Sequence, residues 1–223
     1  MKKFKRHYAA IVDYGMGNIF SIENACQYAG LDCIVTSEKE AILRSAAVIL
    51  PGVGAFGEAV KNLKKLDLTH LIKDIINQGK PFLGICLGMQ LLMSESEEFG
   101  IHKGLDILKG RVVKFASHKS KKIKIPHIGW NKVFFCKQNN APGPILNDIN
   151  NGEFMYFIHS YFIEPSESGD IITTTDYSGI KYCSGLKKGN IYAFQFHPER
   201  SGLEGIKIYR NFKDIINQRG TDD

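Results

Sequence analysis

The sequence predicts an α/β fold in which helices flank an open, mostly parallel sheet, followed by a β-rich antiparallel second half. Before Gly110, short apolar segments rich in β-branched residues alternate with segments of helical period, as in βαβ units. After Gly110, apolar residues alternate in short stretches separated by turn residues, which is typical of antiparallel strands. A content of 43% hydrophobic and 23% charged residues is typical of a globular protein.

The first half contains four expected strands and three expected helical segments. Apolar residues at Ile22, Cys26 and Ala29 recur every three or four positions, which indicates a helix. The strands are Tyr8–Asp13, Cys33–Thr36, Ala46–Leu50 and Phe82–Ile85, and the helical segments are Ile19–Ala29, Phe56–Gln78 with a break near Asp67–Thr69, and Leu87–Met93.

The second half contains six expected strands and a closing helix. The strands are Arg111–Phe115, Gly129–Phe135, Phe154–Phe162, Asp170–Thr175, Ile180–Leu186 and Ile191–Phe196. The helix, Gly202–Gln218, carries Ile208, Phe212 and Ile215 on one face, so we expect it to pack back on the sheet. Because no linker or internal repeat separates the halves, we expect one domain over residues 1–223, with residues 1–6 as a flexible basic tail.

Charge and hydropathy limit the classes of function. The chain has 29 basic and 23 acidic residues, but eight of the positive charges lie in the opening MKKFKR and between Lys119 and Lys124. The remainder is slightly acidic, so we expect no nucleic-acid partner. No apolar run has the length of a membrane helix and no cleavable leader precedes Asp13, so we expect a cytoplasmic protein without a membrane partner.

The cysteines indicate reduced thiols rather than a disulfide framework. Cys26, Cys33, Cys86, Cys136 and Cys183 are odd in number and include no Cys-x-x-Cys pair. This pattern argues against disulfide bonds and against a zinc cluster, so we expect no metal.

Cys86 alone has the surroundings of a nucleophile. It is the middle residue of Gly84-Ile85-Cys86-Leu87-Gly88, where an expected strand ends and an expected helix begins. Such a nucleophile elbow exposes the middle side chain, and the helix N-terminus stabilises its thiolate. The alternative for an isolated cysteine, a buried residue beside packing glycines, fits the combined strand, glycines and helix start less well.

A thiol nucleophile needs a base, and His197 is the best placed of the seven histidines. It follows the expected strand Ile191–Phe196, and Glu199 lies two residues later, where it can orient the imidazole. With Cys86 these residues would form a triad. His127 and His159 lie in strand-like or proline-bounded segments, and we interpret them as structural histidines.

A glycine-rich segment, Pro51–Gly57, follows the third strand at the sheet edge where α/β proteins bind ligands. The N–H groups of Val53 and Leu87 would hold the oxyanion formed when a thiolate attacks a carbonyl, and an ordinary glycine turn is the alternative. Gly15–Asn18 resembles the start of a dinucleotide fingerprint, but Phe20 replaces its third glycine and no P-loop motif is present. We therefore expect no NAD, no ATP and no other cofactor.

Together these motifs resemble the triad-type (class I) glutamine amidotransferases, whose glutaminase domain carries Gly-x-Cys-x-Gly and a later His-Pro-Glu. Within that family, six segments in order are similar to those of glutaminase subunits that supply ammonia to a cyclase making imidazole glycerol phosphate in histidine biosynthesis. The segments are Asp13–Asn18, Leu50–Gly57, Gly84–Leu92, Pro126–Asn131, His159–Tyr161 and Gln195–Gly202.

The resemblance implies a role for each matching residue. Cys86 would attack the side-chain amide of L-glutamine, His197 would protonate the leaving ammonia and Glu199 would orient His197. Ammonia would pass through a tunnel to a separate (β/α)8 cyclase subunit in a heterodimer. The other implied residues are Gly52, Val53 and Leu87 at the oxyanion, Gln90, Ser160 and Tyr161 around the glutamine, and Asn18, Trp130, Asn131 and Arg200 at the partner interface.

Departures from the pattern keep a second pathway open. Arg200 stands where the family commonly has lysine, and the lysine-rich stretch and the basic tail are further departures. Related glutaminases supply ammonia for amidated sugars of bacterial surface polysaccharides, and this is the alternative function. A cysteine hydrolase of the α/β-hydrolase kind would place its acid before the histidine, and a non-catalytic binding module should lack a triad residue, so both fit less well.

Overall fold

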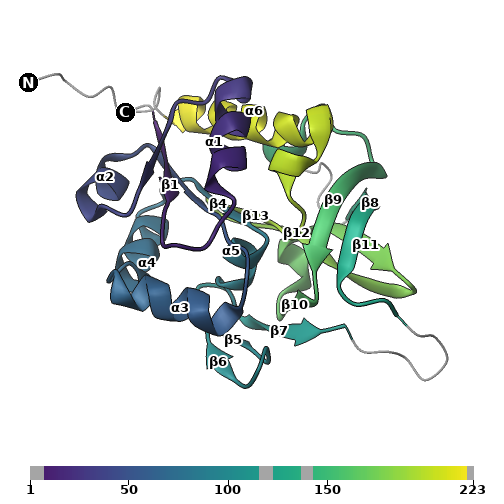
Figure 1. The fold of residues 1–223 in the computed structure, drawn as a ribbon. Helices are drawn as coiled ribbons and strands as arrows, with labels where there is room; N and C mark the ends of the chain where they lie inside the picture. The colour runs from purple at the N-terminus through teal and green to yellow at the C-terminus, as the bar shows by residue number, and fades with distance from the viewer. Residues whose placement is uncertain (1–7, 116–122, 137–142, 220–223) are drawn as a thin grey trace, which may run out of the picture.

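A parallel sheet forms the centre of the molecule (Figure 1). The computed structural model describes residues 8–115, 123–136 and 143–219, so the expected tail at residues 1–6 and most of the lysine-rich stretch lie outside it. The parallel strands, in spatial order, are β2 (Cys33–Thr36), β1 (Ala9–Val12), β3 (Ala47–Leu50), β4 (Phe82–Ile85) and β13 (Ile191–Phe194). The carboxyl ends of β3, β4 and β13 therefore meet at one edge, where the three expected catalytic segments begin.

Helices cover both faces of this sheet because alternate strand residues point to opposite sides. The helices are α1 (Ile19–Ala29), α2 (Lys39–Arg44), α3 (Phe56–Lys65), α4 (Thr69–Asn77), α5 (Leu87–Gln90) and α6 (Gly202–Arg219). Ala9 and Ile11 belong to the core shared with α1 and α6, whereas Ala10 and Val12 belong to the core shared with α3 and α4 (Figure 1). Within the described ranges, none of these helices has the length and apolarity that a membrane span requires.

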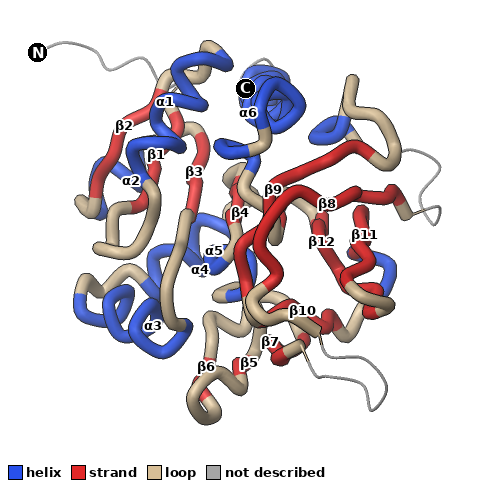
Figure 2. The backbone as a smooth tube through the Cα atoms, turned by 45° about the vertical axis from the view of Figure 1, so that its right-hand side comes forward, coloured by secondary structure: helices blue, strands red, loops and turns tan. Residues whose placement is uncertain are grey.

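The sheet continues from β13 into a mainly antiparallel half, with β8 and β9 side by side at the end away from β2 (Figure 2). The path runs through β12 (Ile180–Lys188), β10 (Tyr161–Pro165), β7 (Gly110–Lys114), β5 (Glu95–Ser96) and β6 (His102–Lys103), and β11 (Ile171–Tyr177), β8 (His127–Phe135) and β9 (Glu153–His159) branch from β12. The predicted fold class is thus confirmed.

Two expected elements differ from the structure. The single strand expected over Phe154–Phe162 is two strands, because β9 pairs with β8 whereas β10 pairs with β7 and β12, and the chain changes partners at Ser160. The helix expected over Leu87–Met93 ends at Gln90, and the carbonyls that follow accept hydrogen bonds from the segment at residues 105–108 instead. Helix α2 has six residues and strands β5 and β6 have two each, so these elements are too short to show an apolar period and were not expected.

Gly88 allows α5 to pass close to β3. A Cβ atom at this position would lie 1.9 Å from the carbonyl oxygen of Leu50, and backbone atoms cannot yield as a flexible side chain does. We expect Gly88→Ala to lower the free energy of unfolding by about 3–5 kcal/mol. Urea unfolding measures this loss, with Gly169→Ala as the control because a Cβ there meets no atom within 4 Å. Equal losses in the two variants would contradict the close passage.

Candidate active site

Cys86 occupies the sharp turn between β4 and α5. Its backbone angles are φ 53° and ψ −108°, a region that L-amino acids seldom adopt. The Cys86 N–H donates to the carbonyl oxygen of Phe194 on the adjacent strand β13, with N and O 2.7 Å apart, which helps to hold the turn. The sequence thus places the strained strand-to-helix turn correctly.

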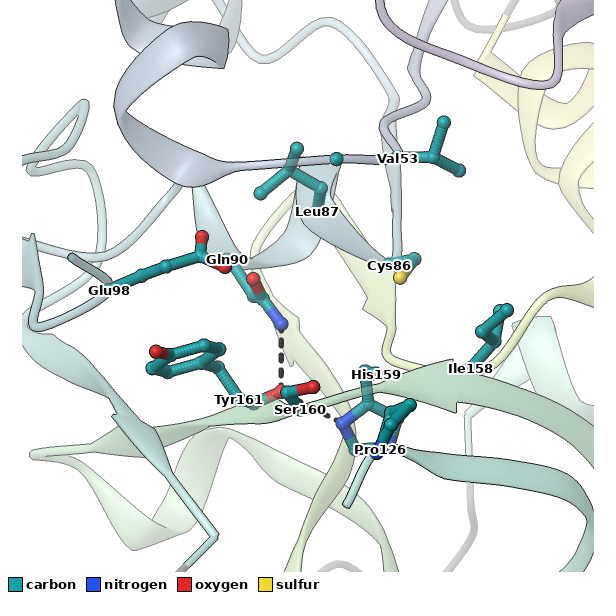
Figure 3. A pocket seen from close by; sticks show the side chains of 11 residues that line it. Val53, Cys86, Leu87, Gln90, Glu98, Pro126, Ile158, His159, Ser160 and Tyr161 are labelled. Atoms are coloured by element: carbon teal, nitrogen blue, oxygen red, sulfur yellow. Dashed lines mark hydrogen bonds between the residues drawn. The ribbon is translucent and has the colours of Figure 1, made fainter.

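The Cys86 side chain borders a cavity of about 290 Å³ (Figure 3). The other lining residues are Val53, Gly54, Leu87, Gln90, Glu98, Pro126, Ile158, His159, Ser160 and Tyr161. Five of the six residues expected around the glutamine and its oxyanion line this cavity, and Gly52 is the exception. Figure 3 shows Cys86 toward one end of the cavity and Glu98 with Tyr161 toward the other.

His197 and Glu199 form a buried pair next to Cys86. His197 follows β13, and its Nδ1 lies 2.7 Å from Oε1 of Glu199, within the short 3-10 helix Pro198–Arg200. Their side chains are only 3% and 1% exposed. Burial disfavours the imidazolium, but the neighbouring Cys86 and Glu199 outweigh burial and raise the pKa of His197 to about 10. His197 is therefore a cation at neutral pH.

Cys86 raises the pKa of His197 by its charge first and by a side-chain contact with the imidazole second. Nε2 of His197 is buried and makes no hydrogen bond of ordinary geometry to a described residue. Because Nδ1 is engaged by Glu199, the Nε2–H group is the one available to protonate a nitrogen bound at the nucleophile.

The N–H groups of Val53 and Leu87, the expected oxyanion donors, lie close together but do not point toward a common position. The Leu87 N–H donates to the carbonyl oxygen of Gly52, with N and O 3.4 Å apart. In a trans peptide a carbonyl and the following N–H point in opposite directions, so the Val53 N–H points away from that of Leu87. A Cβ at Gly52 would lie 2.5 Å from the hydroxyl of Tyr14, which donates to the carbonyl of Pro51. Rotation of the Gly52–Val53 peptide is needed before both N–H groups can face one oxyanion.

Gln195 is a residue of the site that was not predicted from the sequence. Its Nε2 lies 3.6 Å from Sγ of Cys86, and its Oε1 accepts from Nε2 of Gln90, 3.0 Å away. Gln90 also donates to the carbonyl oxygen of Tyr161 at 2.9 Å. The position of Gln195 at the end of β13, two residues before His197, was the available signal.

Glu98 is a second lining residue that was not predicted, and it lies in a polar segment with no motif. Its Oε2 accepts the backbone N–H of Phe56 at 2.6 Å, which fixes the carboxylate at the end of the cavity away from Cys86 (Figure 3). A carboxylate in this position can pair with the amino group of a ligand. Across residues 8–115, 123–136 and 143–219, no group of three or more His, Cys, Asp or Glu side chains is placed to hold a metal ion.

Arg200 and Trp130, two of the four expected interface residues, both pack against the ring of Tyr156. The guanidinium of Arg200 lies 4.4 Å from the ring centre of Tyr156, and Trp130 packs edge-on against the same ring with centres 6.1 Å apart. Asn131 differs, because its Nδ2 donates to a carbonyl of β11 at 2.9 Å on the opposite face of β8. Asn18 is half-buried and directly precedes α1.

The fold and the site define the class of protein. Residues 10–215 match the family model for glutamine amidotransferase class-I, and the chain belongs to this family of enzymes. Among its relatives are proteins named imidazole glycerol phosphate synthase subunit HisH. That of Aquifex aeolicus is 46% identical over 204 residues, covering 91% of this chain and 94% of that protein. That of Caldanaerobacter subterraneus subsp. tengcongensis is 46% identical over 206 residues, covering 92% and 97%.

Solved structures with low sequence identity share the fold. The structure of PurLQS from Thermotoga maritima superimposes with a TM-score of 0.71 at 19% identity and covers 95% of this chain and 99% of that chain. The glutaminase domain of Trypanosoma brucei CTPS, solved with bound acivicin, gives a TM-score of 0.65 at 17% identity and covers 95% of this chain and 94% of that chain.

Proposed function

We propose that this single-domain chain is a cytoplasmic glutaminase subunit that hydrolyses L-glutamine to glutamate and ammonia and delivers the ammonia to a (β/α)8 cyclase in histidine biosynthesis. The observation that carries the glutaminase activity is a strained Cys86 bordering a cavity, with the His197–Glu199 pair next to it. The relatives named imidazole glycerol phosphate synthase subunit HisH favour histidine biosynthesis over the amidation of surface sugars.

The proposed hydrolysis has two steps. The Cys86 thiolate attacks the amide carbonyl, a C–S bond and an oxyanion form, and His197 gives its proton to the amide nitrogen as the C–N bond breaks and ammonia leaves. In the second step neutral His197 takes a proton from water, whose oxygen attacks the thioester. The C–S bond then breaks, glutamate leaves and Cys86 is again a thiolate. Glu199 keeps the imidazole oriented through both steps.

The shape and charge of the cavity support L-glutamine as the substrate. A glutamine whose amide lies at Cys86 would extend its α-amino group toward the carboxylate of Glu98 at the other end (Figure 3). Ser160 lies on the wall between these ends, and the Gln90 amide is fixed against that wall by its bond to the Tyr161 carbonyl (Figure 3).

An exposed apolar surface supports docking of a cyclase subunit over the cavity. One face of the β8–β9 pair carries large, apolar, exposed side chains, among them Ile128 (56%), Trp130 (54%), Phe154 (46%) and Ile158 (38%). Ile158 also lines the cavity, so the surface is continuous with the cavity wall. Such a patch on a protein surface is typical of a protein–protein interface, and ammonia released beneath a docked partner would be shielded from solvent.

The oxyanion arrangement predicts that the isolated chain hydrolyses glutamine slowly. Because the Gly52 carbonyl occupies the Leu87 N–H, a cyclase partner that rotates the Gly52–Val53 peptide should raise the rate about 10²-fold, the usual value of an oxyanion donor. Glutamate release is measured with the chain alone and with the cyclase and its ligand. Trp130→Ala should weaken this activation by weakening the docking. A chain that is fully active alone would contradict the prediction.

A further inference from the structure

A buried cluster beside the cavity contains two histidines and a tyrosine that the two hydrolysis steps do not use. His127, His159 and Tyr182 are only 3%, 6% and 3% exposed. The hydroxyl oxygen of Tyr182 lies 3.2 Å from Nε2 of His159 and 3.2 Å from Nδ1 of His127. Phe115 packs against all three rings, so the polar atoms of the cluster have one another as partners rather than bulk water.

The atoms of this cluster that carry hydrogen can be assigned by elimination. Burial lowers the pKa of His159 to about 3 and that of His127 to about 4, so both rings are neutral. Nδ1 of His159 lies 2.8 Å from the carbonyl oxygen of Tyr161, which can only accept, so Nδ1 carries the hydrogen. Nε2 of His159 then accepts the Tyr182 O–H, and the Tyr182 oxygen accepts the Nδ1–H of His127, with the buried Thr175 hydroxyl as a further donor beside that oxygen. Nε2 of His127 remains an acceptor, and Nδ2 of Asn131 lies 3.4 Å from it.

The same series of hydrogen bonds reaches the nucleophile. The Tyr161 carbonyl accepts from both His159 and Nε2 of Gln90. The second hydrogen on Nε2 of Gln90 goes to Oε1 of Gln195, so the other side of the Gln195 amide must present an N–H to Sγ of Cys86. Every bond in the series thereby has a fixed direction.

We infer that the Tyr182 hydroxyl is a positioning group for the glutamine site. The Tyr182 O–H at Nε2 and the Tyr161 carbonyl at Nδ1 together hold His159 in the Nδ1–H tautomer. The bond from Nδ1–H then helps to fix the Tyr161 carbonyl, which also accepts from Gln90 and so sets the directions of the Gln90 and Gln195 amides. Tyr182 does not line the cavity, so it acts through His159. The inference rests on the proposed glutaminase function and deepens it.

Tyr182→Phe tests the inference because it removes only the hydroxyl. Nitrogen NMR of the histidine-labelled chain should show the Nδ1–H tautomer at His159 in the wild type. The variant should show a larger share of the Nε2–H tautomer, because only the Tyr161 carbonyl then favours Nδ1–H. In complex with the cyclase, kcat/KM for glutamine should fall about tenfold, the usual effect of one buried hydrogen bond. Synthesis from added ammonia should stay within about twofold of the wild type, because it bypasses the glutamine site.

Tyr8→Phe is the matched control. The Tyr8 hydroxyl donates to the carbonyl oxygen of Ala41 at 3.0 Å, outside the cavity and the histidine cluster, so its loss should change neither the tautomers nor kcat/KM. An Nε2–H tautomer at His159 in the wild type would overturn the inference, and this measurement does not require a folded variant. A kcat/KM for Tyr182→Phe equal to that of Tyr8→Phe would also overturn it. Absence of glutamate release by the wild-type complex is a distinct result, because it refutes the proposed function itself.

Discussion

Cys86→Ala is expected to lower kcat for glutamine hydrolysis by about 10⁴-fold or more, because the variant has no atom that can form the thioester. In complex with the cyclase, the variant should still support synthesis when ammonia is supplied directly, since Cys86 acts only to liberate ammonia. Glutamate release and cyclase product are measured on the same preparation, at mildly alkaline pH where more unprotonated ammonia is present.

Cys136→Ala is the control for this experiment, because Cys136 is a half-buried thiol that does not line the cavity. It should keep both activities. Labelling of Cys136 rather than Cys86 by a glutamine-like alkylating agent would contradict the assignment of the nucleophile. If the Cys86→Ala variant supports synthesis from added ammonia with a sugar amidotransferase but not with the histidine cyclase, the protein belongs to the surface-polysaccharide pathway.

His197→Ala is expected to cost about 10³-fold or more in kcat, because it removes the proton carrier beside Cys86. Glu199→Gln should cost less, because the amide keeps a hydrogen-bonding group next to the imidazole and changes mainly its orientation and charge. Steady-state glutamate release by the two variants in complex with the cyclase measures the difference. Similar, near-wild-type rates in both variants would refute the triad.

Glu199→Gln should also change the pH dependence of glutamine hydrolysis. Glu199 is one of the groups that raise the pKa of His197 to about 10, so Glu199→Gln should lower that pKa. Since the reaction needs protonated His197, activity is lost as pH rises through this pKa, and the loss should occur at lower pH in Glu199→Gln than in the wild type. An unchanged alkaline limb of kcat/KM would show that Glu199 does not act on His197.

Local sequence signals predicted most of the fold, the strand-to-helix turn at Cys86 and the pairing of His197 with Glu199. Helix α1 begins and ends at the predicted residues, Ile19 and Ala29, because its apolar period is bounded by the turn at Gly15–Asn18 and by Gly30 in the left-handed conformation. Cys86 was identified because a nucleophile elbow needs a strand, two glycines and a helix start, all within a few residues.

Features that depend on distant contacts were not predictable in this way. At Ser160 the chain changes its strand partners from β8 to β7 and β12, which are distant in sequence, and no local pattern encodes that change. Glu98 and Gln195 enter the site through tertiary contacts with Phe56 and Cys86. The direction of the Gly52–Val53 peptide is likewise invisible in the sequence, because glycine tolerates either orientation.

Because the Gly52 carbonyl accepts the Leu87 N–H in the resting site, binding of glutamine and its turnover can be controlled separately. Glu98 is held by the Phe56 N–H and Ser160 lies between β9 and β10, so neither contact uses the Gly52–Val53 peptide, and we expect glutamine to occupy the resting site. A partner that turns the peptide would then act on kcat and leave KM nearly unchanged. The glutamine concentration would set occupancy, whereas the orientation of a single peptide group would decide whether nitrogen is released.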